Sequence, residues 1–465
     1  MKVFLAVIIC KILYFIGKQI GRGSSLPGKV VLRIFPDILQ RMKLPGTIIA
    51  VTGSNGKTTT TELIVQILKA NGMSTGWNHE GSNQTEGVAT LLLRVATLSG
   101  KVNRDAIVME CDERYARKIF EKVKPTAILV TNLCRDQLTR NGHPEFIEDC
   151  IRASIEAAGD GAKLVLNADD PYVAALATPQ NEVLWFAVKQ GEKQGDGSSA
   201  SPSENNGYRH IGMYDDGAFC PVCKERMTYK YRIAGHYGSY NCNACGLKRN
   251  DPEVEVAMQY SQEPSHSSLI FNTGEKMSIK LPSITGAYNF CAAVAIAKAS
   301  GINAPDSVRA LDGYELTGGR TIKLELKSGE SKDEEKREGL LLLSKHENSF
   351  AYDASLTWIV EQKKPCTVIV LVDAISRKYY TSETSWFWDI DFDLLADTNI
   401  KNIVLAGRYI NELAARFVMS AVDQAKIGYV ADLIELRGYI ETKTTGDIYV
   451  LTCFSDKAKL LKAFE

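Results

Sequence analysis

Residues 46–68, GTIIAVTGSNGKTTTTELIVQIL, decide the fold class of this chain. The apolar run at residues 46–52 predicts a buried strand, and from Thr58 onward apolar side chains recur at helical spacing. A glycine-containing loop at residues 52–58 joins the two. Strand, glycine loop and helix in this order are typical of a phosphate-binding site, because the N–H groups at the start of the helix converge on an anion.

The loop carries the groups that nucleotide binding requires. Its glycines let the backbone approach a phosphate, Lys57 adds a positive charge, and the Thr58 hydroxyl can ligate magnesium. The first glycine of the usual P-loop pattern would fall at Val51, so the match is not strict. We predict that ATP contacts seven consecutive residues: Gly53, Ser54, Asn55, Gly56, Lys57, Thr58 and Thr59.

A group of acidic residues follows the apolar strand predicted at residues 106–109. The chain continues as ECDE at residues 110–113. Strand ends lie beside the phosphate loop in parallel sheets of this kind, so a carboxylate here can complete a magnesium site. We predict that Glu110 and Thr58 bind the magnesium ion, and we expect Glu113 to lie in a solvated loop.

Apolar strands recur through the first part of the chain, at residues 106–109, 127–131 and 163–167. Helical stretches separate them, and this alternation predicts an α/β domain with a mostly parallel sheet. A helix rich in small residues is predicted at 288–299. We assign residues 41–315 to this central domain.

Polar stretches mark the other parts of the chain. Residues 190–207 are rich in Gly, Ser, Gln and charge, which predicts a mobile loop or linker. The charged stretch at 328–339 precedes further apolar strands. Three further units are predicted. Residues 1–40 form an N-terminal helical segment, and residues 208–252, approximately, form a cysteine-bearing module inserted into the central domain. Residues 316–465 form a second, smaller Rossmann-like α/β domain.

Length and composition limit the class of partner. A chain of 465 residues suggests two or three domains of roughly 150 residues each. Its 55 basic and 55 acidic residues give a net charge of zero, so there is no global electrostatic reason to bind nucleic acid or an anionic membrane. Eleven cysteines, four of them in two tight pairs, indicate metal ligands and buried thiols in a reducing cytoplasm.

The N-terminal segment at residues 3–16 is apolar apart from Lys11. It is too short to span a bilayer comfortably, and no small-residue cleavage site follows it. Either it packs as a helix on the domain, or it lies on the inner face of the membrane with basic residues on anionic headgroups. The expected location is therefore cytoplasmic, with peripheral membrane association as the open alternative; the basic residues are Lys2, Lys11, Lys18 and Arg22.

The cysteine module contains two C-x-x-C pairs separated by eighteen residues, the spacing of a zinc ribbon. Four thiolates fill a tetrahedral site and leave no position for water, so the zinc should be structural. His236 would then be a bystander or a support for the ligands. Basic and aromatic residues around the module leave nucleic-acid binding open as an alternative. The predicted zinc ligands are Cys220, Cys223, Cys242 and Cys245.

The loop from Thr52 to Thr60 resembles that of the Mur ligases and folylpolyglutamate synthases, which activate a carboxylate as an acyl phosphate. Within the Mur ligases, further motifs resemble the MurT-type ligase subunits of lipid II isoglutaminyl synthase. Amino-acid-adding Mur ligases usually have a magnesium-binding histidine where this chain has Gln137. The motifs are LPGK at 26–29, the segment 78–86, TNLCRDQL at 131–138, NADDP at 167–171 and the four-cysteine module.

The resemblance implies roles for residues outside the loop. Asn289 would lie near the adenine, and Arg320 would reach the phosphates from the hinge between domains. The tryptophan-rich segment at 385–392 is similar to a segment of the MurT-type terminal domain, although a core strand with acidic ends is an alternative. In the family this domain docks a glutaminase and contributes an aspartate to its Cys-His pair, so Asp389 is our first candidate and Asp391 the second.

The function implied is ATP-dependent amidation of the α-carboxylate of D-glutamate in the stem peptide of lipid II. The product would be D-isoglutamine, formed during peptidoglycan synthesis with ammonia from a partner glutaminase in a heterodimer. None of the remaining cysteines lies in a Gly-x-Cys-x-Gly elbow, so no glutaminase nucleophile is expected in this chain. The alternatives are a ligase of the same chemistry that adds an amino acid, and a nucleotide fold retained only for binding.

Overall fold

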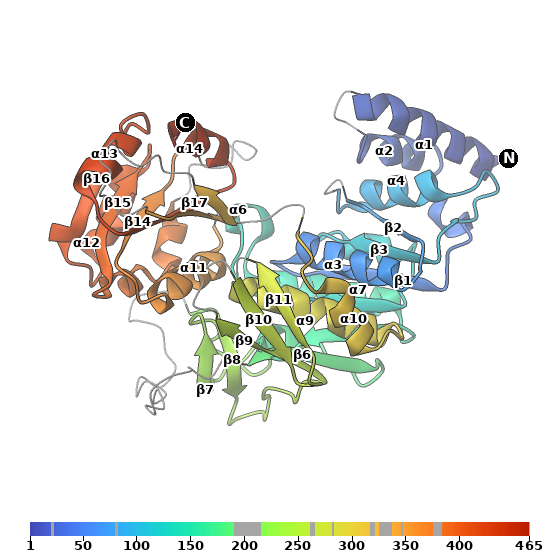
Figure 1. Cartoon of the computed structure of the whole chain (residues 1–465). Coiled ribbons are helices and arrows are strands. Elements are labelled where there is room, and N and C mark those ends of the chain that lie inside the picture. Colours follow the sequence, from blue (N-terminus) through green and yellow to red (C-terminus); the bar gives the residue numbers. More distant parts are fainter. Residues whose placement is uncertain are drawn as a thin grey trace.

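The computed structural model shows two α/β units with a group of helices at the N-terminal end of the first (Figure 1). Arg320, which the resemblance places at the phosphates, lies outside the described residues. The structure describes residues 1–19, 23–79, 82–189, 215–260, 266–280, 283–316, 321–324, 337–345, 347–374 and 384–464.

The N-terminal helices pack against the central unit rather than extending away from it. Helices α1 (Lys2–Gln19) and α2 (Leu26–Ile34) contact each other and α4 (Thr85–Val95). A short 3-10 helix, η1 (Leu39–Arg41), leads into the first strand. Among the residues described, no helix is both long enough and apolar enough to cross a bilayer.

The central sheet has nine strands in the order β11-β10-β9-β6-β5-β4-β1-β3-β2. The pairs from β2 through β9 are parallel, whereas β10 pairs antiparallel with both β9 and β11. The predicted parallel α/β sheet is therefore confirmed. Its strands are β1 (Thr47–Thr52), β2 (Thr75–Trp77), β3 (Ala106–Glu110), β4 (Ala127–Val130), β5 (Lys163–Asn167), β6 (Val183–Lys189), β9 (Val254–Tyr260), β10 (His266–Phe271) and β11 (Lys276–Lys280).

Helices cover both faces of this sheet, because its strands are apolar on both sides. One face packs on α3 (Lys57–Ala70), α9 (Ile284–Ala299) and α10 (Ala304–Leu311). The predicted helix at 288–299 begins earlier, at Ile284, because the Ser283 hydroxyl caps it by accepting from the Gly286 N–H. The other face packs on α1, α2, α4, α5 (Ala116–Phe120), α7 (Pro144–Ala158) and α8 (Pro171–Ala174).

The cysteine module is inserted between two neighbouring strands of the central sheet. Strands β6 and β9 pair in parallel, and the module occupies the chain between them. Its β7 (Thr228–Ile233) and β8 (Tyr237–Asn241) form a separate antiparallel hairpin.

The C-terminal unit is a six-stranded sheet in the order β12-β13-β17-β14-β15-β16, parallel except for β12. The predicted smaller Rossmann-like unit is confirmed. One face packs on α11 (Ser349–Glu361), η2 (Ser385–Asp389), η3 (Phe392–Ala396) and α12 (Ile410–Val418), and the other on α13 (Leu436–Lys443) and α14 (Lys457–Phe464). The strands are β12 (Thr321–Leu324), β13 (Gly339–Ser344), β14 (Cys366–Leu371), β15 (Ile400–Ala406), β16 (Ile427–Val430) and β17 (Asp447–Cys453).

The helices of this unit include the tryptophan-rich segment. It forms a 3-10 helix, so the alternative of a core strand is wrong. A short helix of the central unit, α6 (Leu138–Asn141), follows the Thr-Asn segment. The C-terminal helices are α11 (Ser349–Glu361), η2 (Ser385–Asp389), η3 (Phe392–Ala396), α12 (Ile410–Val418), η4 (Gln424–Lys426), α13 (Leu436–Lys443) and α14 (Lys457–Phe464).

Candidate functional site

The glycine loop between β1 and α3 has the geometry of a phosphate cradle. Gly53 and Gly56 have φ angles of +122° and +81°, which L side chains rarely adopt. A Cβ on Gly53 would lie 2.3 Å from the Thr131 hydroxyl, and one on Gly56 would lie 2.1 Å from Oδ1 of Asn289. Gly56 is the N-cap of α3 and no side chain caps this end, so the first N–H groups of the helix can serve an anion.

The end of β4 holds the loop in place. The Asn55 N–H donates to Oδ1 of Asn132 at 2.9 Å, and the Thr131 hydroxyl donates to the Asn55 carbonyl at 2.7 Å. The Ser54 N–H donates to the Asn132 carbonyl at 2.8 Å. Because these groups follow β4, the neighbour of β1 in the sheet, the parallel topology itself fixes the loop.

The structure brings Thr58 and Glu110 together. The Thr58 hydroxyl donates to Oε2 of Glu110 at 2.8 Å, and Glu110 is 5% exposed at the end of β3. The Asn78 side chain fixes the Glu110 backbone through two hydrogen bonds of 2.9 Å. A hydroxyl and a carboxylate are ligands that Mg²⁺ prefers, so the two residues fit the metal predicted for them.

Lys57 is buried and pairs with Glu113 at 2.6 Å. Burial alone would lower the pKa of Lys57, but the neighbouring carboxylates, first Glu113 and then Glu110 and Asp136, together raise the pKa above its ordinary value. Glu113 is 3% exposed, so the expected solvated loop is wrong: the residue faces the phosphate loop. Lys57 is therefore charged and positioned, and a phosphate must compete with Glu113 for it.

A cavity of about 270 Å³ opens beside the loop. Asn55, Gly56 and Thr59 lie on its phosphate side. Asn289 lines it from α9 and accepts a hydrogen bond from the Thr60 hydroxyl at 3.2 Å. The cavity continues from the phosphate loop, so it is placed where the nucleoside of a bound nucleotide would lie.

The C-terminal unit closes on the phosphate loop through residues that the sequence did not single out. The Asn348 side chain donates to Asn55 and to Asp136, both at 2.8 Å, and its Oδ1 caps α11. Lys345 donates to the Ser54 carbonyl at 3.0 Å. The loop is thus held by both units. In the sequence, these contacts are indicated only by Asn348, a residue type that favours the N-cap position at which it precedes α11.

Asp389 lies at the interface between the two units. It is 6% exposed and accepts from Arg135 at 2.6 Å, where Arg135 belongs to the Thr-Asn segment after β4. The Asp391 N–H donates to Oδ1 of Asp353 at 2.7 Å. In this structure the carboxylate of Asp389 therefore faces the ligase centre.

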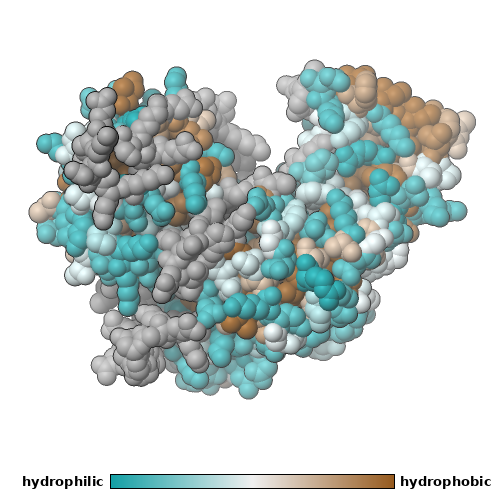
Figure 2. All heavy atoms as spheres, viewed as in Figure 1, coloured by the Kyte–Doolittle hydropathy of each residue, from teal (hydrophilic) through white to brown (hydrophobic). Residues whose placement is uncertain are grey.

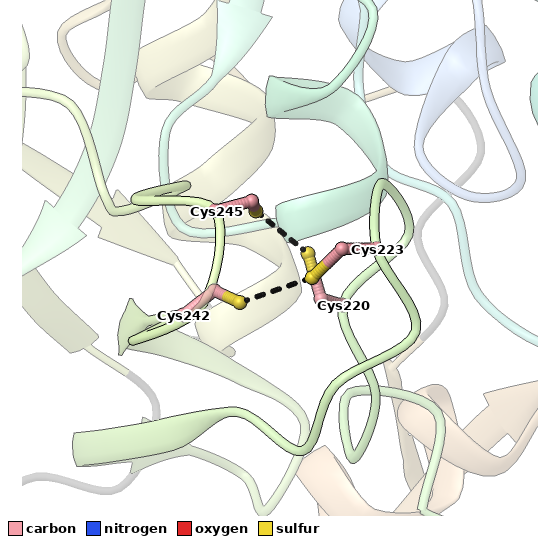
Figure 3. A group of neighbouring side chains, drawn as sticks. All are labelled: Cys220, Cys223, Cys242 and Cys245. Atoms are coloured by element: carbon pink, nitrogen blue, oxygen red, sulfur yellow. Dashed lines mark hydrogen bonds between the residues drawn. The ribbon is translucent and has the colours of Figure 1, made fainter.

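The four cysteines converge as predicted (Figure 3). All four Sγ atoms lie within 4.8 Å of one another, with Cys220 3.5 Å from Cys245 and Cys223 3.4 Å from Cys242. Hydrogen bonds from the N–H groups of Cys245 and Ala244 lower the pKa of the Cys242 thiol to about 7. Four converging sulfur atoms fit a tetrahedral zinc ion.

His236 is not a bystander. It is 1% exposed, and its ring contacts Asp216 at 3.0 Å through Nδ1 and Asp353 at 2.8 Å through Nε2. Asp353 belongs to α11, so the imidazole joins the cysteine module to the C-terminal unit. The ring of the next residue, Tyr237, lies 4.7 Å from that of Phe350, which lines the cavity.

We expect His236→Ala to lower the free energy of unfolding by about 3 kcal/mol, because it leaves two buried carboxylates facing each other without the ring between them. Denaturant unfolding measures the difference. His143→Ala, at an exposed histidine, is the control and should change stability little. An equal effect of both variants would contradict a structural role for the bridge.

Family models and solved structures both identify this chain as similar to Mur ligases. The model of the Mur ligase middle domain matches residues 51–248, and the model of the MurT ligase C-terminal domain matches residues 345–456. A MurF ligase from Thermotoga maritima solved with ADP has a TM-score of 0.61 and 15% identity, covering 94% of this chain and 83% of that one. A pseudomurein peptide ligase type C from Methanothermus fervidus has a TM-score of 0.64 and 20% identity, covering 92% and 80%.

Fold and phosphate site together define a Mur-type ligase. Two curated relatives have the name lipid II isoglutaminyl synthase (glutamine-hydrolyzing) subunit MurT. The one from Streptococcus pneumoniae is 28% identical over 95% of this chain and 92% of its own length, and the one from Staphylococcus aureus strain COL is 26% identical over 91% and 89%. The chain belongs to the Mur ligase family, in its MurT-type branch.

Proposed function

We propose that this carbon–nitrogen ligase uses ATP to amidate the α-carboxylate of D-glutamate in the stem peptide of lipid II, giving D-isoglutamine for peptidoglycan synthesis. Two findings together support the proposal: the arrangement of the phosphate site, and relatives that have the name lipid II isoglutaminyl synthase subunit MurT. The site comprises Lys57, Thr58 and Glu110, and the relatives match over about nine tenths of the chain.

The reaction proceeds in two steps. A carboxylate oxygen of the substrate attacks the γ-phosphorus of ATP, which forms an acyl phosphate and releases ADP. Ammonia then attacks the carbonyl carbon, inorganic phosphate leaves, and the proton lost by nitrogen passes to solvent or phosphate. Carboxylate activation thus converts a poor leaving group into a good one.

The residues of the chain bind and orient the reactants. Lys57 and the N-terminal N–H groups of α3 stabilise charge on the transferred phosphoryl group. Thr58 and Glu110 would hold a magnesium ion, which when bound would offset negative charge on the phosphate oxygens. Thr59 and Asn289 line the adjoining cavity, where they would contact the nucleoside of bound ATP. Arg320, outside the described residues, completes the proposed set at the phosphates.

We assign the four-cysteine site to structural zinc. Four thiolates would fill a tetrahedral coordination sphere and leave no position for a reacting water. Two neighbouring residues of the module, His236 and Tyr237, contact α11, so a zinc ion bound there would support the packing of α11 beside the ligase centre.

Ammonia comes from a partner glutaminase subunit. Outside the zinc site the seven cysteines are buried or half-buried, and burial raises the pKa of the Cys10 thiol to about 12 and that of Cys111 further. Such thiols are poor nucleophiles. In the proposed heterodimer, the Asp389 carboxylate releases Arg135 and accepts a hydrogen bond from the histidine of the partner glutaminase. The lipid-linked substrate places the chain at the cytoplasmic face of the membrane.

We expect Asp389→Asn to abolish most amidation that uses glutamine and the partner, and to spare amidation with ammonium. The amide keeps an acceptor oxygen but loses the negative charge, and its NH₂ group can favour the wrong tautomer of the histidine of the partner. Amide product is measured with each nitrogen donor for Asp389→Asn and, in parallel, for Asp391→Asn at the second candidate, which should keep both activities if Asp389 has the role. If both donors fail equally, Asp389 serves the ligase through Arg135 and not the glutaminase.

The alternative ligase chemistry is tested by the choice of nucleophile. ADP release is measured with lipid II and either ammonium or each common amino acid. The proposal requires turnover with ammonium. Turnover only in the presence of an amino acid would replace amidation by amino-acid addition, and ATP binding with no ADP release under any condition would leave a binding protein.

A further inference from the structure

Helix α1 has apolar side chains on two sides, and only one of these sides packs against other described helices. Its inner side packs on α2 and α4, with Ala6, Val7 and Cys10 fully buried. The Cys10 thiol donates to the Thr90 carbonyl, and Lys11 donates to the Ala96 carbonyl at 2.8 Å. Of the two alternatives for this segment, packing on the domain is thus observed, yet it leaves the outer side unexplained.

The outer side exposes large apolar side chains along the whole helix. At 100° per residue, they lie within about 120° of the helix circumference. Figure 2 shows the resulting apolar patch over the N-terminal helices. The exposed fractions are 45% for Phe4, 43% for Leu5, 54% for Ile12, 70% for Phe15 and 53% for Ile16. We call these five residues the outer face of α1.

Lysines flank the outer face. By the same helical geometry, Lys2 falls beyond one edge of the apolar arc, whereas Lys11 and Lys18 fall beyond the other. An apolar arc with lysine at both edges is typical of helices that lie in the interface of a bilayer.

The charge of the whole N-terminal region has one sign. Residues 1–36 contain six basic and no acidic residues, although the complete chain is neutral. Two copies of this chain joined through their outer faces would bring these like charges together, which is unfavourable. An anionic lipid surface instead complements them. The basic residues are Lys2, Lys11, Lys18, Arg22, Lys29 and Arg33.

We propose that the outer face of α1 binds the surface of an anionic lipid bilayer, with the helix parallel to the membrane plane. Because its inner side is packed on protein, the helix lies on the bilayer and does not cross it. The inference rests on the proposed function only in supplying a reason for this contact: a lipid-linked substrate remains in the membrane.

The packing connects this face to the reaction centre. Helix α1 contacts α4, and the segment before α4 contains Asn78 and Asn83. Asn78 fixes the Glu110 backbone, and Asn83 donates to the Glu110 carboxylate at 3.4 Å. Helix α4 therefore connects a membrane-bound α1 to the segment that contacts Glu110 of the proposed magnesium site.

The test is sedimentation of the full chain with vesicles of phosphatidylcholine alone or of equimolar phosphatidylcholine and phosphatidylglycerol. We expect binding to the anionic vesicles that weakens at high salt. The variant Ile12→Gln/Phe15→Gln/Ile16→Gln should bind about tenfold more weakly or worse, since it removes most of the exposed apolar area. The control Val418→Gln/Met419→Gln/Ile434→Gln alters exposed apolar residues of the C-terminal unit and should bind as the native chain does.

Three results would overturn the inference: equal binding by the outer-face variant, equal binding to both kinds of vesicle, or a native dimer that the variant converts to a monomer in the absence of lipid. Amidation of detergent-solubilised lipid II is measured in parallel. If vesicle binding is absent while amidation proceeds, only this inference fails. If binding is as expected and amidation is absent, only the proposed function fails.

Discussion

Lys57→Ala is expected to lower kcat for ATP-dependent amidation about 10³-fold, because it removes the buried ammonium group that would offset charge on the transferred phosphoryl group. The KM for ATP should rise as well. Initial rates of ADP release and of amide formation measure both effects. Lys69→Ala, at an exposed lysine of the same helix, is the control and should retain native activity.

The ion pair with Glu113 requires a second variant. Lys57→Ala alone leaves a buried carboxylate without its cation, which costs about 3 kcal/mol of stability or more. Lys57→Ala/Glu113→Gln removes that charge, so it should unfold at nearly the native denaturant concentration while remaining inactive. Native activity in this double variant would show that the phosphate site is wrongly assigned.

Cys220→Ser/Cys242→Ser is expected to reduce zinc content from about one equivalent to near zero, because two thiolates cannot hold a tetrahedral zinc ion. The two buried ligands of the site are removed, so the hairpin of β7 and β8 should lose its order. Atomic absorption measures the metal, and hydrogen exchange of residues 215–250 measures the order of the module.

The loss of order in the module should also weaken ATP binding. Because His236 and Tyr237 contact α11, we expect a higher KM for ATP, with the chemical step itself retained. Cys150→Ser, at a half-buried cysteine outside the site, should leave both zinc and kinetics unchanged. Full zinc content in the double variant would contradict the assignment of these ligands.

Local sequence patterns predicted the parts of the fold that depend on neighbouring residues. The apolar run before Gly53 and the helical spacing after Thr58 predicted β1 and α3, and two C-x-x-C pairs predicted the cysteine cluster. These features could be found because strand, loop and ligand spacing are each encoded within a few residues.

Contacts between distant segments could not be predicted in this way. Glu113 follows a strand and is polar, which is also the pattern of a solvated loop, and only the packing of β3 beside β1 places it against Lys57. Asn348 and His236 meet partners 293 and 117 residues away. Apart from the N-cap position of Asn348, nothing in the local sequence indicates their roles, because these contacts form only where the two units meet.

The most direct test of the account is mass spectrometry of lipid II after incubation with the chain, magnesium, ATP and ¹⁵N-labelled ammonium. We predict one ¹⁵N atom in an amide at the α-carboxylate of the D-glutamate residue, formed only when ATP is present and absent with Lys57→Ala/Glu113→Gln. Lipid II that remains unlabelled while ATP is hydrolysed, or label that enters without ATP, would contradict the proposed function.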